Sequence, residues 1–137
     1  MSRFHIILFL TFIYSITCSY GNEITFFTSK NSSFNSIQIE TIRNLYLGRE
    51  KFIGSSKIQV VDLKNDQPIF LEKLIKKEIK NYNGLWRMMV FTGQALAPKV
   101  FKSNKELFEY VASNKNVLAY TTSKLDHSEL KSLKIVL

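Results

Sequence analysis

Residues 85–120 read LWRMMVFTGQALAPKVFKSNKELFEYVASNKNVLAY, and this stretch contains most of the signals that decide the fold. A Thr-Gly turn and a proline separate an aromatic, apolar segment from the tetrapeptide Ser-Asn-Lys-Glu at 103–106. That tetrapeptide is a capping box, in which the serine and glutamate side chains accept hydrogen bonds from free N–H groups at a helix start. The helix that it opens has Leu107, Phe108 and Val111 on its apolar side, and residues 116–122 follow as a strand. The stretch therefore predicts a helix followed by a strand.

The sequence before this stretch also alternates strands with helices. Residues 23–29 are rich in β-branched and aromatic residues, which favours a short buried strand, and residues 57–63 favour a second one. Between them, apolar residues recur with helical spacing over 39–46, and Gly48 follows as a helix stop. A loop that turns at Gly54 then leads into the second strand.

A second helix is expected to begin at Asp66, because Asp is a good N-cap residue and Pro68 is tolerated in the first turn. Its apolar stripe consists of Phe70, Leu71, Leu74, Ile75 and Ile79. We expect a break at 81–84 (NYNG), then a short helical or irregular piece over 85–91, and a fourth strand at 133–137. Strands that alternate with helices indicate an α/β domain with a mixed, mostly parallel sheet of about four strands flanked by helices.

The aromatic residues in the second half of the chain are spaced as core residues between helices. They could form a ligand platform, but each buries a large apolar area, which favours a place in the core. This prediction covers Tyr82, Trp86, Phe91, Phe101, Phe108 and Tyr110.

The first 21 residues have the pattern of a cleavable secretory signal, and residues 22–137 are expected to form a single domain. Arg3 supplies a basic start, an apolar run follows, and Ser19 and Gly21 stand where a signal peptidase prefers small residues. Two alternatives remain open: a retained membrane anchor, although the run is shorter than a bilayer span requires, and a lipoprotein modified at Cys18. Export to the periplasm is the prediction, with no stable membrane span after cleavage.

The chain of 137 residues has a formal net charge of +8, and its lysines are scattered among acidic residues. A solvated surface explains this pattern, and attraction to anions, either phosphate-like solutes or anionic envelope surfaces, is the functional interpretation. Binding to nucleic acid is not expected, because no basic surface with interleaved aromatic residues stands out. Simple adsorption to an anionic membrane surface is a weaker alternative, since the sequence has no strongly basic amphipathic helix.

No sequence motif of catalysis is present, so we expect neither an enzyme nor a cofactor. The chain lacks a nucleophile elbow, a P-loop, a dinucleotide-binding glycine motif and a zinc-protease motif. His127 stands near Asp126 and Glu129, but one imidazole with two acids in a polar segment is more typical of surface than of a metal site. No metal is therefore predicted.

The order of these segments resembles that of phosphate ABC transporter substrate-binding proteins, in particular the short single-domain members of the family. IETIRNLYLGRE (39–50) resembles their helix with Ile-Phe-x-Gly-Lys, and IQVVDL (58–63) stands at their next strand. Residues 85–120 resemble their Trp … Phe-Thr-Gly-x-Gly-x-x-Pro … Ser … Tyr-Val … Gly-Tyr ending. The resemblance implies one lobe of a periplasmic-binding-protein-like fold, with phosphate or a related oxyanion as ligand and an ABC permease as partner.

Seven residues are the candidate ligand contacts on this interpretation. They are Thr28 and Ser29 after the first strand, Asp66 and Gln67 at the helix start, and Thr92, Gly93 and Gln94 in the Thr-Gly turn. For Thr28 and Ser29 an ordinary strand-to-loop boundary is the competing explanation.

The sequence also departs from the family pattern. The family's Arg-Ser-x-x-Ser-Gly-Thr loop is replaced by DLKNDQPIFLEKL (62–74), in which Asp62 and Asp66 would repel an oxyanion. Ala95 replaces the second glycine of the Thr-Gly turn, and Asn116 and Ala119 replace glycines near the last strand. The alternative function is therefore a non-catalytic accessory of the envelope or of a sensor, which kept the fold, lost the oxyanion site and contacts another protein.

Overall fold

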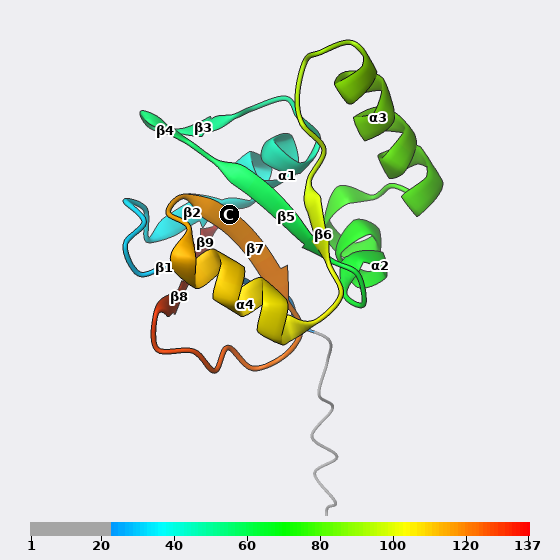
Figure 1. Cartoon of the computed structure of the whole chain (residues 1–137). Helices are drawn as coiled ribbons and strands as arrows, with labels where there is room; N and C mark the ends of the chain where they lie inside the picture. Colours follow the sequence, from blue (N-terminus) through cyan, green and yellow to red (C-terminus); the bar gives the residue numbers. More distant parts are fainter. Residues whose placement is uncertain (1–22) are drawn as a thin grey trace, which may run out of the picture.

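The computed structural model describes residues 23–137, which form an α/β domain around a five-stranded sheet with the strand order β6-β5-β7-β1-β8 (Figure 1). The strands are Lys99–Phe101 (β6), Gln59–Leu63 (β5), Val117–Thr121 (β7), Thr25–Ser29 (β1) and Leu130–Ser132 (β8). β5 is parallel to β6 and β7, whereas β1 is antiparallel to both β7 and β8. All the strands except β1 therefore point the same way, which confirms the mixed, mostly parallel sheet with β6 and β8 added to the expected strands.

Two short strand pairs stand outside this sheet. β2 (Ser36–Gln38) pairs in parallel with β9 (Lys134–Val136), so the strand predicted at 133–137 exists but does not join the main sheet. β3 (Phe52–Ile53) and β4 (Ser56–Lys57) form a hairpin that turns at Gly54, whose φ is +60°. Glycine adopts this left-handed conformation without steric cost, so the predicted turn is confirmed.

The helices lie on both faces of the sheet and beside one edge. Their bounds are Ile39–Tyr46 (α1), Gln67–Phe70 (α2), Ile79–Phe91 (α3) and Asn104–Ser113 (α4), and a π-helical turn, Leu71–Ile75 (η1), continues α2. Figure 1 shows α4 in front of the sheet, α1 behind it and α3 beyond the β6 edge. α4 begins as predicted, because Ser103 Oγ accepts a hydrogen bond of 3.2 Å from the backbone N–H of Glu106.

The predicted break at 81–84 is wrong, because the chain breaks earlier, at Lys76. Lys76 has a left-handed backbone with φ of 60°, and the next helix begins at Ile79, so Ile79 does not extend the apolar stripe of the preceding helix. Residues 81–84 lie inside α3 despite their weak helix propensity. Tyr82 and Trp86, one helical turn apart, are both buried. Their burial stabilises the helix through the unfavourable segment.

The core is aromatic where α1, α2 and the sheet meet. The rings of Phe70 and Tyr120 stack with centroids 4.0 Å apart, and Tyr46 meets Phe70 edge-on at 4.6 Å. Such pairs add to the free energy of burying their apolar area. This cluster holds the start of the second helical segment against the middle of the sheet.

Most of the aromatic residues predicted for the core are there, but Phe91 is not. Tyr82, Trp86, Phe101 and Phe108 are buried, and the half-buried Tyr110 packs on Phe101 with ring centroids 5.0 Å apart. Phe91 is 92% exposed, so its predicted core position is wrong. Phe91 follows Trp86 by five residues, which turns it roughly 140° away from the buried face of α3.

Candidate functional site

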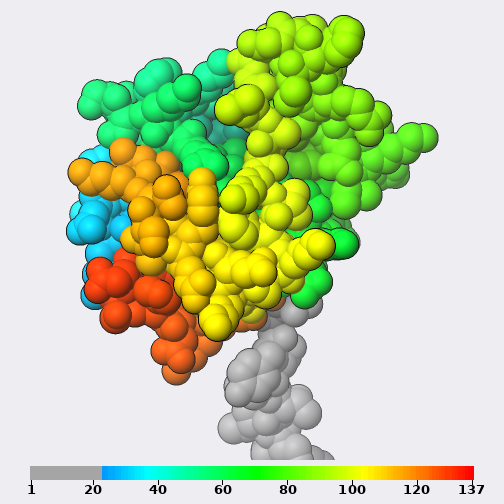
Figure 2. Space-filling view, in the orientation of Figure 1, coloured from blue at the N-terminus to red at the C-terminus, as the bar shows by residue number. Residues whose placement is uncertain are grey.

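A cavity of about 660 Å³ lies between the hairpin β3–β4 and the loop formed by residues 92–98. The surface is hollowed between these two segments (Figure 2). The N-terminal end of β5 and the residues just before β7 complete the lining. Its apolar side chains include Leu45, Ile58, Val60, Trp86, Val90 and Leu96, and its polar ones are Glu50, Lys51, Lys57, Gln59, Gln94, Lys115 and Asn116.

Close packing between α1 and α3 forms one wall of this cavity. Gly48, just after α1, has φ of +72°, and a Cβ atom at this position would overlap the side chain of Met89. Glycine is therefore favoured by the left-handed backbone, whereas the overlap concerns only the flexible end of the Met89 side chain. Trp86 donates from its indole nitrogen to the backbone oxygen of Tyr46 at 3.0 Å, which holds the indole ring at the cavity.

Three lysines make the cavity electropositive. Lys51, Lys57 and Lys115 line it together with one acid, Glu50, which accepts a hydrogen bond from the Asn44 side chain at 3.2 Å. Lys51 Nζ donates to the backbone oxygen of Gln94 at 2.5 Å and so ties the hairpin to the loop 92–98. Among residues 23–137, Lys57 and Lys115 have no ion pair and no hydrogen bond from their ammonium groups.

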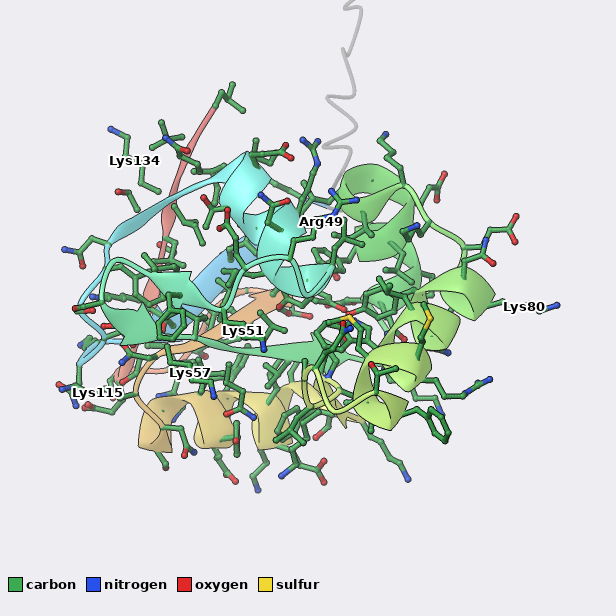
Figure 3. All side chains as sticks on the ribbon, turned by 90° about the horizontal axis from the view of Figure 1, so that it is seen from above. Arg49, Lys51, Lys57, Lys80, Lys115 and Lys134 are labelled. Atoms are coloured by element: carbon green, nitrogen blue, oxygen red, sulfur yellow. The ribbon has the colours of Figure 1, made fainter. Side chains whose placement is uncertain are left out.

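The labelled basic side chains lie at different sides of the molecule in Figure 3. Lys51 and Lys57 lie toward the middle of the view, whereas Lys115, which also lines the cavity, lies at its left edge. Lys80 and Lys134 lie at opposite sides of the molecule and do not line the cavity. The basic charge is therefore spread over the surface, and only part of it faces this concave site.

Asn116 carries an unusual side chain at the same cavity. Its Oδ1 atom is buried and has no hydrogen-bond partner, and no other buried side-chain oxygen or nitrogen within residues 23–137 shares this condition. Its backbone is left-handed with φ of 60°, a conformation that asparagine tolerates better than most residues. A buried acceptor without a donor costs free energy, so this side chain is an exception among the buried polar groups of residues 23–137.

A chain of hydrogen bonds behind the cavity holds Asn116 in place. The backbone N–H of Asn116 donates to Ser32 Oγ at 3.1 Å, and Ser32 Oγ lies 2.8 Å from Thr28 Oγ1. Thr28 Oγ1 donates in turn to the backbone oxygen of Val117 at 2.7 Å, so the Ser32 hydroxyl must be the donor to Thr28. Thr28 thus supports the cavity from behind and does not line it.

Asp66 lies at the opposite end of β5 and occupies the N-cap position of α2, as predicted. Its side chain, however, makes no capping hydrogen bond. Its carboxylate accepts hydrogen bonds from the backbone N–H of Thr122 at 2.7 Å and from the hydroxyls of Thr122 at 2.9 Å and Thr121 at 3.4 Å. Charged acceptors make stronger hydrogen bonds, and the parallel pairing of β5 and β7 brings these donors to Asp66. A carboxylate of the chain itself thus occupies the donors that an oxyanion would need there.

Asp62 is buried in the interior beside two tyrosines. Its carboxylate accepts hydrogen bonds of 2.9 Å from the hydroxyl of Tyr82 and 2.7 Å from that of Tyr120. Burial raises the pKa of Asp62 to about 6, and the hydrogen bonds from Tyr120, Tyr82 and Gln67 oppose this shift. Burial also raises the pKa of both tyrosines, and the negative charge of Asp62 adds to this. The cluster belongs to the core, and none of its three residues lines the cavity.

The seven predicted contact residues do not come together in one place. Thr28 and Ser29 are buried at the end of β1, and Ser29 Oγ accepts from the backbone N–H of Asn31 at 3.3 Å. The end of β1 lies near the N-terminal end of β5, because β1 is antiparallel to β7 and β7 is parallel to β5. Asp66 and Gln67 follow the other end of β5, and its five residues place the two ends roughly 17 Å apart. The site suggested by Thr28, Ser29, Asp66 and Gln67 is therefore not a single constellation.

The Thr-Gly turn lies at the cavity. Gly93 and Gln94 line it, and all three turn residues are exposed. Thr92 Oγ1 donates to the backbone oxygen of Met88 at 2.9 Å, which closes the end of α3. Thr92 and Gln94 also line a smaller neighbouring cavity of about 350 Å³, together with Arg49 and Lys77. The turn is thus both the corner after α3 and one rim of the cavity.

Sequence reasoning missed the lysines and Asn116 as members of this site. Phe52 pairs with Lys57 across the hairpin, and this pairing could have placed the hairpin lysines near one another. The left-handed backbone of Asn116 was a second available signal. Lys115 comes to the site only through the pairing of β5 with β7, in which Gln59 is opposite Val117.

No helix within residues 23–137 combines the length and the apolar character needed to cross a membrane. Over the same residues, no group of three or more histidine, cysteine or acidic side chains is placed to hold a metal ion. The predicted signal segment, including Cys18, lies outside the described residues.

Comparison with known proteins identifies the fold. No protein-family model matches the sequence, and no curated protein matches it. Three solved structures share the fold over 82% of this chain. One is a protein assigned as a phosphate ABC transporter substrate-binding protein, with bound phosphate, from Clostridium perfringens (14% identity, TM-score 0.63). The others are an ABC-type phosphate transport receptor from Vibrio cholerae (12%, 0.51) and PstS from Borrelia burgdorferi (18%, 0.53).

The match covers 44%, 45% and 46% of those three chains, so this chain spans less than half their length. At these identities the likeness concerns the fold. The domain is one lobe of a periplasmic-binding-protein-like fold, as the resemblance of the sequence implied.

Proposed function

We propose that this chain is an exported, non-catalytic solute-binding protein that takes a small anion in the cavity between the hairpin β3–β4 and the loop 92–98. The observation that supports this most is that Lys57 and Lys115 line a concave surface without partners among residues 23–137. Unpaired cations around a cavity attract anions and increase their local concentration.

Phosphate or a related oxyanion is the ligand suggested by the solved structures, since one of them contains bound phosphate. In this chain such an anion would meet lysines in the cavity and not Asp66, whose neighbouring donors already serve its carboxylate. Water competes for every donor at an open site, so binding of inorganic phosphate is expected to be weak, in the millimolar range.

Export and a transport partner are part of the same proposal. The first 21 residues have the pattern of a secretory signal, which favours the periplasm. The names of the solved relatives refer to ABC transport, and an ABC permease would be the corresponding partner of this chain.

The test is a titration of the purified full-length chain with inorganic phosphate, sulfate and small organic carboxylates. Calorimetry measures binding, and fluorescence of Trp86, the single tryptophan of the chain, reports changes at the cavity. Lys57→Gln combined with Lys115→Gln should weaken binding of any anion at least ten-fold. The matched control, Lys80→Gln with Lys134→Gln, removes the same charge away from the cavity and should leave affinity within two-fold.

The comparison separates a site from general attraction. Equal weakening by both double variants would mean that net charge alone attracts the anion, which would overturn the proposed site. The absence of binding by every anion tested would overturn the proposed function.

An interaction module is the second candidate, because apolar side chains gather on the outside near the end of α3. Phe91 and Leu96 are 92% and 89% exposed, and Met88, Val90 and Val100 are also exposed. Exposed apolar groups of this kind are typical of protein contact surfaces. The donors around Asp66 are already hydrogen-bonded to its carboxylate, which fits this alternative as well. The fold would then be kept without an oxyanion site at that end.

A further inference from the structure

We infer that the cavity takes an amphipathic organic anion, one that has an aromatic or branched apolar body, an anionic group and a hydrogen-bond donor. The inference rests on the proposed function because it concerns the same cavity, and it names the class of ligand. Three independent features of the lining support it: its size and apolar wall, its unpaired cations and its orphan acceptor.

The size of the cavity exceeds what a simple oxyanion needs. A volume of about 660 Å³ is within the range of cavities that take organic molecules of drug-like size. Inorganic phosphate is far smaller and would leave most of the apolar wall in contact with water. The cavity therefore fits a ligand with a carbon skeleton.

The wall offers apolar surface to such a skeleton. Trp86 and Ile58 form part of it while remaining mostly buried, and Val90 and Leu96 extend it outward from α3 and the loop. Leu96 is 89% exposed, so a ligand that covers it would remove apolar area from water. Burial of this kind contributes roughly 25 cal/mol for each Å² of apolar surface.

The cations select the charge of the ligand. Lys57 and Lys115 line the cavity without partners among residues 23–137, whereas Lys51 donates to Gln94. One acid, Glu50, lines the cavity too, and the three lysines outweigh its charge. An anionic group next to Lys57 or Lys115 would gain a charge-assisted hydrogen bond.

Asn116 supplies the third requirement. Its buried Oδ1 lacks a donor, and the hydrogen bonds through Ser32 and Thr28 keep its backbone fixed. A ligand hydroxyl or N–H that reached this atom would satisfy it, whereas sulfate and plain hydrocarbons would not. The inferred ligand therefore has a hydrogen-bond donor in addition to its apolar body and its anionic group.

The test uses 6-hydroxy-2-naphthoate as a probe, with 2-naphthoate and inorganic phosphate beside it. All three are titrated into the full-length chain by calorimetry. We expect both naphthoates to bind more tightly than phosphate. The hydroxylated compound should bind about five-fold more tightly than its parent, as one added hydrogen bond implies.

Variants locate the binding. Lys57→Gln with Lys115→Gln should weaken both naphthoates at least ten-fold, and Lys80→Gln with Lys134→Gln should not. Asn116→Gly keeps the left-handed backbone and removes the orphan oxygen. It should abolish the preference for the hydroxyl, so that the two naphthoates bind this variant with equal affinity.

The outcomes distinguish this inference from the proposed function. If phosphate binds at the lysines and the naphthoates do not, the inference is wrong and the proposed function stands. If no anion binds, both are wrong. A hydroxyl preference that survives in Asn116→Gly would overturn the role assigned to Asn116, and naphthoate binding that survives the Lys57 and Lys115 changes would overturn the site.

Discussion

At the scale of single residues, three polar side chains behave in ways that their types alone do not explain. Within residues 23–137, Asp62 is buried without an ion pair, Asp66 binds the end of a neighbouring strand, and Asn116 has an oxygen without a donor. Buried polar groups are costly unless they are satisfied, so each one constrains either the fold or a ligand. Asp62 and Asp66 are satisfied within the chain, which leaves Asn116 as the one on which the inferred ligand donor rests.

Asp62 makes stability depend on pH. Burial raises its pKa to about 6 in the folded chain, above the ordinary value of 3.8 that the unfolded chain would have. Between these two values the folded chain binds more protons at Asp62, so the contribution of Asp62 to stability is largest below about pH 4 and is lost as the pH rises through about 6. A shift of this size corresponds to about 3 kcal/mol.

Asp62→Asn should remove this pH dependence, because the amide keeps the shape and does not ionise. We expect urea unfolding midpoints to lose their fall between about pH 4 and pH 6, and the free energy of unfolding at pH 7.5 to rise by about 1–3 kcal/mol. The exposed Asp126→Asn serves as the control. A variant that is less stable than the parent at pH 7.5 would contradict this prediction. It would show that the hydrogen bonds from Tyr82 and Tyr120 stabilise the ionised carboxylate by more than burial destabilises it.

At the scale of elements, the left-handed residue Lys76 decides where one helical segment ends and α3 begins. It closes η1, and α3 starts three residues later. Nothing in the residue type marks this position, since lysine rarely adopts positive φ. The packing of Leu74 and Ile75 on one side and of Tyr82 on the other imposes the break.

Lys76→Gly should stabilise the chain, because glycine adopts this backbone without strain. We expect the free energy of unfolding to rise by about 0.5–1 kcal/mol, measured by urea denaturation. Lys77→Gly is the matched control, since Lys77 does not have a positive φ. It should lower stability by about 0.5 kcal/mol through the greater freedom of the unfolded chain. Equal effects of the two changes would contradict the role of the left-handed backbone.

At the scale of the whole molecule, α3 and the loop after it project beyond the sheet (Figures 1 and 2). The exposed apolar residues near this end, Met88, Val90, Phe91, Leu96 and Val100, contribute little to the core. In the isolated chain these side chains are in water, unless a ligand or a partner covers them. Measurements of the free energy of unfolding can test this, because the loss of a side chain in water costs much less than the loss of a core side chain.

Phe91→Ser with Leu96→Ser should change the free energy of unfolding by less than about 0.5 kcal/mol, because both side chains are in water. The buried Phe101→Ala should cost about 3–5 kcal/mol in the same assay. Retention on a hydrophobic-interaction column should fall for the surface variant. A loss above about 1 kcal/mol in the surface variant would indicate that the face is already covered, for example by a second copy of the chain.

The sequence by itself determined the alternation of strands and helices, the cap at Ser103, the helix stop at Gly48, the turn at Gly54, and most of the aromatic core. These features depend on the spacing of apolar residues and on the backbone preferences of neighbouring residues, which are local properties. For the same reason the sequence led to the correct fold class.

Only the tertiary structure decided which polar residues meet. Asp66 was predicted as a cap, but its donors come from Thr122, at the end of another strand. Lys57, Lys115 and Asn116 are brought to one cavity by the hairpin and by the parallel pairing of β5 with β7. Strand pairing joins residues that are far apart in the chain, so it cannot be predicted from the spacing of neighbouring residues in the sequence.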